Sequence, residues 1–294
     1  PNSSMRTSSM IYSGIYNSRT GINDTNVFSV GEDIVKSVNP ANGSIQRLYA
    51  ENTNLTIFQE SKVSRALIDK DAIYSAEGGG TVTSSNLVIG AIQPYKGNFG
   101  ISKNPESFGI YGFRKYFTDK DRGAVLRLSN DGLTEISNYG MSDYFRDQLS
   151  ALDVSNSSLG KIIGGWDIHN KQYVLSLQPA DTSSTYQTLS FDDSVNGFPS
   201  FFNYEPDQVI SLKNNFYSTK NGSIYKHYTS ISPQAPPPLR GNFYGQQYNS
   251  NVTFIFNPKI SMSKVFKTIN YEGSNGWQVN SFVSDITGVN TPNT

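Results

Sequence analysis

The clearest strand-forming pattern in the chain is GWDIHNKQYVLSL, at residues 165–177. Its polar centre, His169-Asn170-Lys171, interrupts two apolar runs and is suited to a turn. After the turn, large apolar residues occupy every second position from Tyr173 to Leu177, which is the period of a half-buried β-strand. The segment therefore predicts a β-hairpin.

Other segments repeat this arrangement. The dipeptide Asn221-Gly222 separates strand-like runs at 216–218 and 223–228, and tight hairpin turns favour Asn-Gly. We expect Ile224 in the second run to face inward. Similar runs lie at residues 116–118, 124–128 and 133–136. The chain is therefore predicted to be mainly β, with many short antiparallel strands.

One segment has the period of a helix. The apolar residues of 141–150 fall on one helical face. We predict that Ser142 caps the N-terminus and that Asp143 interacts favourably with the helix dipole. One short helix among many strands suits antiparallel, β-propeller-like meanders. A β-sandwich fits the strand spacing equally well, and the periodicity does not separate the two architectures.

Composition divides the chain into four parts. Residues 1–50 are rich in Ser, Asn and Thr and are predicted to form a polar arm or linker, while 51–232 form a β-rich, propeller-like region. The prolines of 233–240 cannot donate hydrogen bonds to a sheet and predict an exposed connector. A second β-rich segment follows at 241–294. Because the first residue is Pro1, we expect a processed chain or a piece of a longer one.

Charge and composition exclude several functional classes. In 294 residues, 24 Lys and Arg balance 24 Asp and Glu, so the formal net charge is zero. This balance disfavours a protein that coats nucleic acid. No apolar run approaches eighteen residues, so we predict no membrane insertion by this segment. The absence of cysteine excludes disulfides and thiolate catalysis.

A group of basic residues is interleaved with aromatic residues between positions 62 and 127. Basic side chains contact phosphates and aromatic rings stack on bases, so this stretch is a candidate DNA path. An aromatic core with a solvated charged face fits the same pattern. The candidate contacts are Lys62, Arg65, Arg114, Lys115, Arg122 and Arg127.

Signals for catalysis are weak. The two histidines, His169 and His227, lack the spacing of a metal site, and a catalytic base needs a partner that the sequence does not place. Asp192 and Asp193 are adjacent in a polar turn, where such residues are usually solvated. We therefore predict no catalytic residue, no metal site and no cofactor.

An ordered set of segments resembles a known family. Its members are residues 54–74, 101–108, 121–129, 131–137, 189–192, 197–201, 221–227, 242–245 and 266–273. Together they resemble virion structural proteins of tailed bacteriophages. They are similar to the tail nozzle proteins of short-tailed phages, including the muzzle-type proteins of crAss-like phages. The resemblance covers residues 50–282.

The resemblance implies a propeller-containing component of the virion tail. It implies a ring of six copies around the channel through which the genome leaves. Its partners would be copies of itself and other tail or portal-proximal proteins, with transient contact to genomic DNA. Proteins of this kind are usually much longer than 294 residues, which agrees with the expectation of a fragment. No catalytic set is implied.

Two other functions stay open. A phage depolymerase that binds or cleaves glycans is also rich in strands and aromatic residues, and cleavage would need two carboxyl groups about 5 to 9.5 Å apart in a groove. A tail attachment adaptor would bind another tail protein through the proline-rich connector or through residues 1–50.

Overall fold

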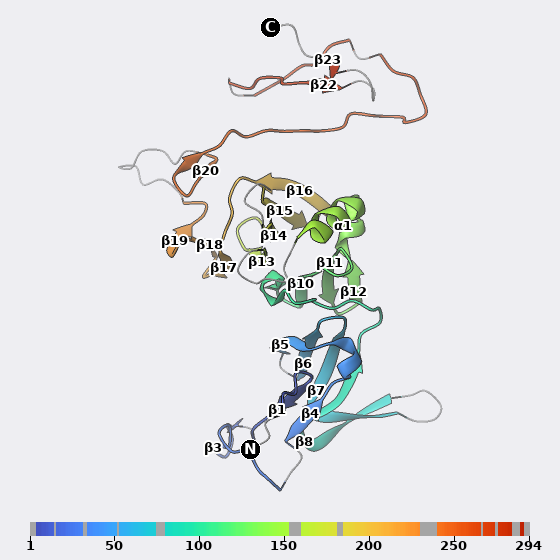
Figure 1. Cartoon of the computed structure of the whole chain (residues 1–294), viewed down its shortest axis with the longest axis vertical. Coiled ribbons are helices and arrows are strands. Elements are labelled where there is room, and N and C mark those ends of the chain that lie inside the picture. Colours follow the sequence, from blue (N-terminus) through green and yellow to red (C-terminus); the bar gives the residue numbers. More distant parts are fainter. Residues whose placement is uncertain are drawn as a thin grey trace. The chain divides into compact units, whose positions relative to one another are not determined.

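The computed structural model confirms a mainly β chain with antiparallel sheets and one short α-helix (Figure 1). The structure describes residues 4–14, 16–31, 34–51, 53–74, 80–152, 160–180, 185–229, 240–265, 267–273, 276–283 and 289–290. The predicted proline-rich connector, 233–240, lies outside these residues except for Arg240.

Four large sheets follow one another along the chain, and in each of them every strand pairs with the next. The first contains β5 (Ile45–Glu51), β6 (Asn54–Gln59), β7 (Val63–Tyr74) and β8 (Gly80–Pro94). The second contains β9 (Gly109–Tyr111), β10 (Arg114–Asp119), β11 (Ala124–Ser129) and β12 (Gly132–Glu135). The third contains β13 (Lys161–Asp167), β14 (Gln172–Gln178), β15 (Gln187–Asp192) and β16 (Gly197–Phe202). The fourth has three strands, β17 (Gln208–Leu212), β18 (Asn215–Lys220) and β19 (Ser223–Lys226).

The remaining elements are short. Two-stranded pairs join β1 (Ser9–Ile11) to β4 (Val35–Ser37), β2 (Tyr16–Asn17) to β3 (Ile22–Asn23), β20 (Asn242–Phe243) to β21 (Gln246–Gln247), and β22 (Phe282–Val283) to β23 (Val289–Asn290). Single 3₁₀ turns lie at η1 (Pro40–Asn42), η2 (Pro105–Ser107) and η3 (Ile136–Asn138).

The predicted hairpins form, but the burial of the first one differs from the prediction. Strands β13 and β14 pair around a turn in which Lys171 has a positive φ of 57°. Every residue from Tyr173 to Leu177 is buried, so both faces of β14 are covered rather than one. The reason is that Val174 packs against the fourth sheet while its neighbours pack on the second-sheet side.

The predicted helix is α1 (Ser142–Ala151), and its apolar face is confirmed. Phe145 and Leu149 are fully buried in the apolar cluster that the second and third sheets share. The predicted cap is wrong by one position. Met141 is the N-cap, without a side-chain hydrogen bond, and Ser142 is the first helical residue.

The large sheets pack face to face in chain order. Strand β10 lies between two interfaces: Phe117 packs against the first sheet and Tyr116 against the third, because successive side chains of a strand point to opposite faces. The third sheet also approaches η2 closely, since a Cβ at Gly164 would lie 2.0 Å from the Ser107 carbonyl oxygen. These sheets are meanders of the predicted kind. They do not form a closed propeller among the described residues, and the sandwich alternative stays open.

The fourth sheet is covered on one face. Its strand β17 alternates between exposed and half-buried residues, and Phe216 on β18 is fully buried in a cluster with Val174 and Tyr204. The opposite face carries Ile224, which is 75% exposed. The prediction that Ile224 faces inward is therefore wrong, because the described part of the chain places nothing over that face.

His227 packs against the buried cluster of the fourth sheet. From its burial we predict that the free energy of unfolding decreases in acid. Its Nε2 is 2.7 Å from Ser218 Oγ, and burial lowers the pKa of the imidazole from 6.5 to about 4. Between these two values the unfolded chain binds a proton that the folded chain does not. The contribution of His227 to the free energy of unfolding is therefore fully present above about pH 6.5. It falls as the pH drops toward 4, by up to about 1.4 kcal/mol per pH unit.

Urea unfolding at a series of pH values measures this dependence. His227→Gln is expected to remove this fall in the free energy of unfolding with decreasing pH. His169→Gln, at an exposed position, is expected to keep it. An unchanged slope in His227→Gln would contradict the assignment.

Contacts divide the chain into two units, residues 1–249 and 250–294. In the first unit, Met10 and Val38 from the N-terminal segment pack against Ile57 of the first sheet. The predicted boundaries at residue 50 and at 233–240 stay predictions. No helix in the described parts of the chain has the length and apolar character needed to cross a lipid bilayer.

Candidate functional site

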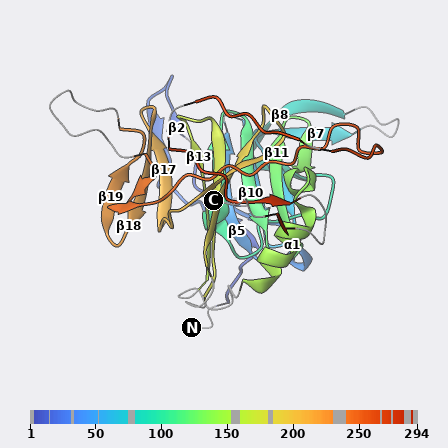
Figure 2. The same cartoon turned by 90° about the horizontal axis from the view of Figure 1, so that it is seen from above.

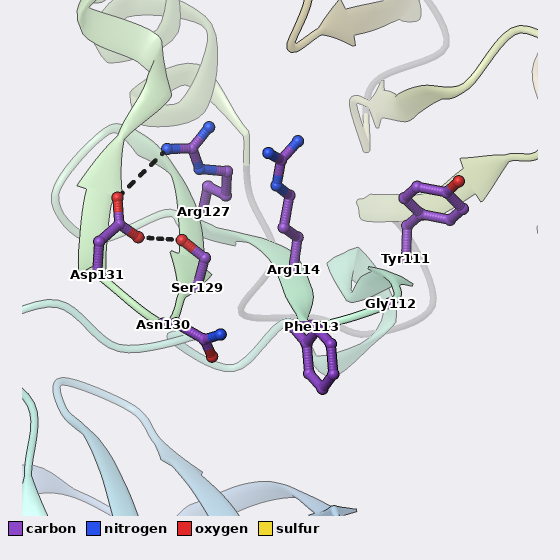
Figure 3. A pocket seen from close by; sticks show the side chains of 8 residues that line it. All are labelled: Tyr111, Gly112, Phe113, Arg114, Arg127, Ser129, Asn130 and Asp131. Atoms are coloured by element: carbon purple, nitrogen blue, oxygen red, sulfur yellow. Dashed lines mark hydrogen bonds and ion pairs between the residues drawn. The ribbon is translucent and has the colours of Figure 1, made fainter.

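A cavity of about 480 Å³ lies on the second sheet, where the β9–β10 and β11–β12 turns come together (Figure 3). The cavity is lined by eight residues, Tyr111, Gly112, Phe113, Arg114, Arg127, Ser129, Asn130 and Asp131. Arg114 and Arg127 lie on the neighbouring strands β10 and β11, and their guanidinium groups extend in the same direction (Figure 3). Two of the six predicted basic residues therefore line one cavity.

Both guanidinium groups bind one carboxylate. Arg114 Nη1 lies 2.9 Å from Asp193 Oδ2, and Arg127 Nη1 lies 2.8 Å from Asp193 Oδ1. The Tyr116 hydroxyl donates a further hydrogen bond to the same carboxylate. Asp193 follows β15, so this cluster joins the third sheet to the second. Asp193 and Arg127 are each only 14% exposed, whereas the Arg114 side chain is 48% exposed.

A row of stacked rings connects the cavity to the core. Tyr111 stacks on Trp166 with centroids 4.5 Å apart, Trp166 on Tyr116 at 5.3 Å, and Tyr116 on Tyr173 at 5.1 Å. Burial, and then the hydrogen bond to Asp193, raise the pKa of Tyr116 far above its ordinary value. Its hydroxyl is therefore protonated at every physiological pH and stays a hydrogen-bond donor to the carboxylate.

Two more of the predicted basic residues are held by carboxylates elsewhere. Lys115 Nζ lies 2.6 Å from Glu51 Oε1 on β5, and the Lys115 side chain is 4% exposed. Arg122 Nη1 lies 3.1 Å from Asp119, whose fully buried carboxylate also accepts from the Gly100 amide. The first pair joins the first sheet to the second, so its position indicates a structural role.

Lys62 lies in the turn between β6 and β7, Arg65 lies on β7, and both have polar, uncharged partners. Lys62 donates to the Gly97 carbonyl at 2.6 Å, and Arg65 donates to Gln93 Oε1 at 2.9 Å. The structure thus brings Arg114 and Arg127 together and places the other four basic residues apart from them. That these six residues contact DNA stays a prediction.

Hydrogen bonds lower the pKa of two carboxyl groups in this region, Asp131 and Asp192. The Ser129 hydroxyl bonds to Asp131 and lowers the pKa of that carboxyl, and the Ser194 hydroxyl does the same for Asp192. A general acid in glycoside hydrolysis needs a raised pKa instead. Among the described residues, no group of three or more His, Asp and Glu is placed to hold a metal ion.

Sequence reasoning missed the role of Asp193. We expected a solvated turn residue, and the structure makes this side chain the partner of two arginines and a tyrosine. The turn itself gave no signal, because the three partners lie 66, 77 and 79 residues away in the chain.

The C-terminal part of the chain matches a described family. Residues 239–293 match the model of the Crassvirus muzzle protein C-terminal domain. This segment is similar to the muzzle C-terminal domain. The match bears out the resemblance to muzzle-type tail proteins and supports a place in the virion tail. No curated protein sequence matches the chain. The Arg114–Asp193 cluster lies outside the matched segment, so the match assigns no role to it.

Proposed function

We propose that this chain is a ring-forming subunit of the phage tail muzzle. Six copies would surround the channel through which the genome leaves, in contact with other tail or portal-proximal proteins. The observation that carries the proposal is the match of residues 239–293 to the muzzle C-terminal domain. The role is mechanical, because a conduit guides DNA without making or breaking bonds.

Exposed apolar side chains support an assembly function. On the fourth sheet, Ile210 and Ile224 face solvent in the single chain, and in residues 250–283 Phe254, Ile255 and Val265 do so as well. Large contiguous apolar patches are rare on monomeric proteins, and they mark protein contacts. Neighbouring subunits in a ring would cover them.

The charge pattern suits a channel through which DNA passes without being retained. Each phosphate contact strengthens binding and makes it more sensitive to salt. Carboxylates already pair with Lys115, Arg122, Arg114 and Arg127, and among these four Arg114 is the most exposed, at 48%. We propose that transient DNA contacts come from the candidate residues that keep exposed charge, with Arg114 first among them, and that these contacts are weak.

Native mass spectrometry and class-averaged electron microscopy of the full chain test the ring. We expect a closed ring of six copies with a central channel, and density for Arg114 at the lumen. A monomer would contradict the proposal, and a spike-shaped trimer would favour the attachment or depolymerase functions instead. A ring that places Arg114 away from the lumen would keep the conduit and reject the DNA contact.

A further inference from the structure

Among the described residues, the fourth sheet has one strand fewer than the three sheets before it, and one of its two edges pairs with no further strand. At its inner edge, β17 packs closely on β13: Ser211 Oγ donates to the Trp166 carbonyl at 2.5 Å and accepts from the Ile168 amide at 3.2 Å. At its outer edge lies β19, which pairs with β18 alone in the described part of the chain (Figure 2). A missing fourth strand would therefore belong beside β19.

The hairpin geometry defines which backbone groups face that open edge. Asn221 and Gly222 have φ of 48° and 76°, so they form a two-residue type I′ turn. The flanking pair, Lys220 and Ser223, is then hydrogen-bonded across the ladder. Hydrogen-bonded and non-hydrogen-bonded residue pairs alternate along β19. Accordingly, the His227 amide donates to the Phe216 carbonyl at 2.9 Å.

It follows that the N–H and C=O groups of Ile224 and Lys226 point away from β18. These are the groups to which an added strand would bond. The Ile224 side chain is exposed, so the edge also offers an apolar contact. Open edges of this kind are normally covered in soluble proteins.

A segment of the same chain has the composition of the absent strand. Residues 251–255, Asn-Val-Thr-Phe-Ile, are rich in β-branched and aromatic residues, which strands favour. Val252, Phe254 and Ile255 are all exposed, the last of them to 94%. Within the described residues no strand pairs with this segment. It begins immediately after the first unit ends at Asn249.

We infer that residues 251–255 of one copy form the fourth strand of the β17–β19 sheet of a neighbouring copy. This inference rests on the proposed ring and names the contact that closes it. In this arrangement each copy donates residues 251–255 and receives a strand at its β19 edge, so the contact is head-to-tail. A closed ring fills every β19 edge, whereas an open chain of copies leaves one β19 edge bare. Val252 and Phe254 would lie on the face that carries Ile224.

Cysteine cross-linking of the full chain tests the strand exchange, because the natural sequence has no cysteine. One preparation carries Lys226→Cys and the other Val252→Cys, and the two are mixed and treated with a short bis-maleimide. We expect covalent dimers containing one chain of each kind. Replacing Lys226→Cys by Ser150→Cys, an exposed helical position, is the control and should give no dimer.

A chain that carries both Lys226→Cys and Val252→Cys distinguishes strand pairing between copies from strand pairing within one copy. Cross-linking within single chains, without dimers, would show that the strand pairs in its own copy and would overturn the inference. Ile224→Pro removes an outward N–H that β18 does not use, so it should abolish the ring while Ile224→Val retains it. A ring that survives Ile224→Pro without mixed dimers would overturn the exchange and leave the proposed function intact. A monomeric wild-type chain would overturn both.

Discussion

Replacing Asp193 by alanine is expected to lower the free energy of unfolding by about 3 kcal/mol, because a mostly buried arginine loses its closer carboxylate partner and keeps the 3.9 Å contact to the exposed Asp131. Arg127 is 14% exposed and would lose its 2.8 Å contact. The buried Tyr116 hydroxyl would lose its acceptor as well. Chemical unfolding, followed by tryptophan fluorescence because Trp166 stacks on Tyr116, measures the loss.

Two variants separate charge from shape in this cluster. Asp193→Asn keeps the size and one acceptor oxygen but removes the charge, so it should recover only part of the lost stability. Asp192→Ala removes the adjacent carboxylate, which bonds to Ser194 and Gln172 but to neither arginine, and should cost about 1 kcal/mol. Equal effects of Asp192→Ala and Asp193→Ala would contradict the role given to Asp193.

Loss of the Glu51 carboxylate is the second large effect that we expect. Glu51→Ala removes the carboxylate that pairs with the Lys115 ammonium. The Lys115 side chain is 4% exposed, and its Nζ lies 2.6 Å from Glu51 Oε1. The ammonium keeps a contact with the face of the Tyr49 ring, with Nζ 5.5 Å from the centroid. Breaking a buried pair from one side costs roughly 3 kcal/mol or more. Thermal and urea unfolding of the variant would measure this cost.

A double-mutant cycle tests whether an uncompensated charge causes that loss. Adding Lys115→Met to Glu51→Ala removes the stranded ammonium and keeps most of the side-chain volume, so stability should recover toward that of the natural chain. If the double variant is no more stable than Glu51→Ala alone, then packing rather than charge holds the first two sheets together at this point.

Local sequence patterns predicted the hairpins because the determinants of a hairpin are local. The polar turn after Asp167 and the Asn221-Gly222 dipeptide each lie between the strands that they connect. The apolar face of α1 follows from helical periodicity in the same way. Its first residue was misplaced by one position, because Ser142 makes no capping bond.

Features that depend on how sheets stack could not be predicted from local patterns. Periodicity assigns Ile224 to one face of a strand but does not indicate whether another layer covers that face. The same limit explains Val174, which was expected on an open face and is buried by the fourth sheet. Asp193 meets Arg127 only because the second and third sheets are packed together. The six basic residues were grouped by sequence, whereas only two of them share a cavity.

The order of strands in the large sheets has a consequence for synthesis. Each of the four large sheets is built from strands that are consecutive in the chain, so its contacts are local and it can form soon after its last strand leaves the ribosome. Each sheet then provides an apolar face for the next one to be made. Residues 251–255 are translated after all four sheets. Under the strand exchange proposed above, a nascent chain that stalls within the sheets has no strand to donate, so translation itself would delay the joining of subunits until the stack is finished.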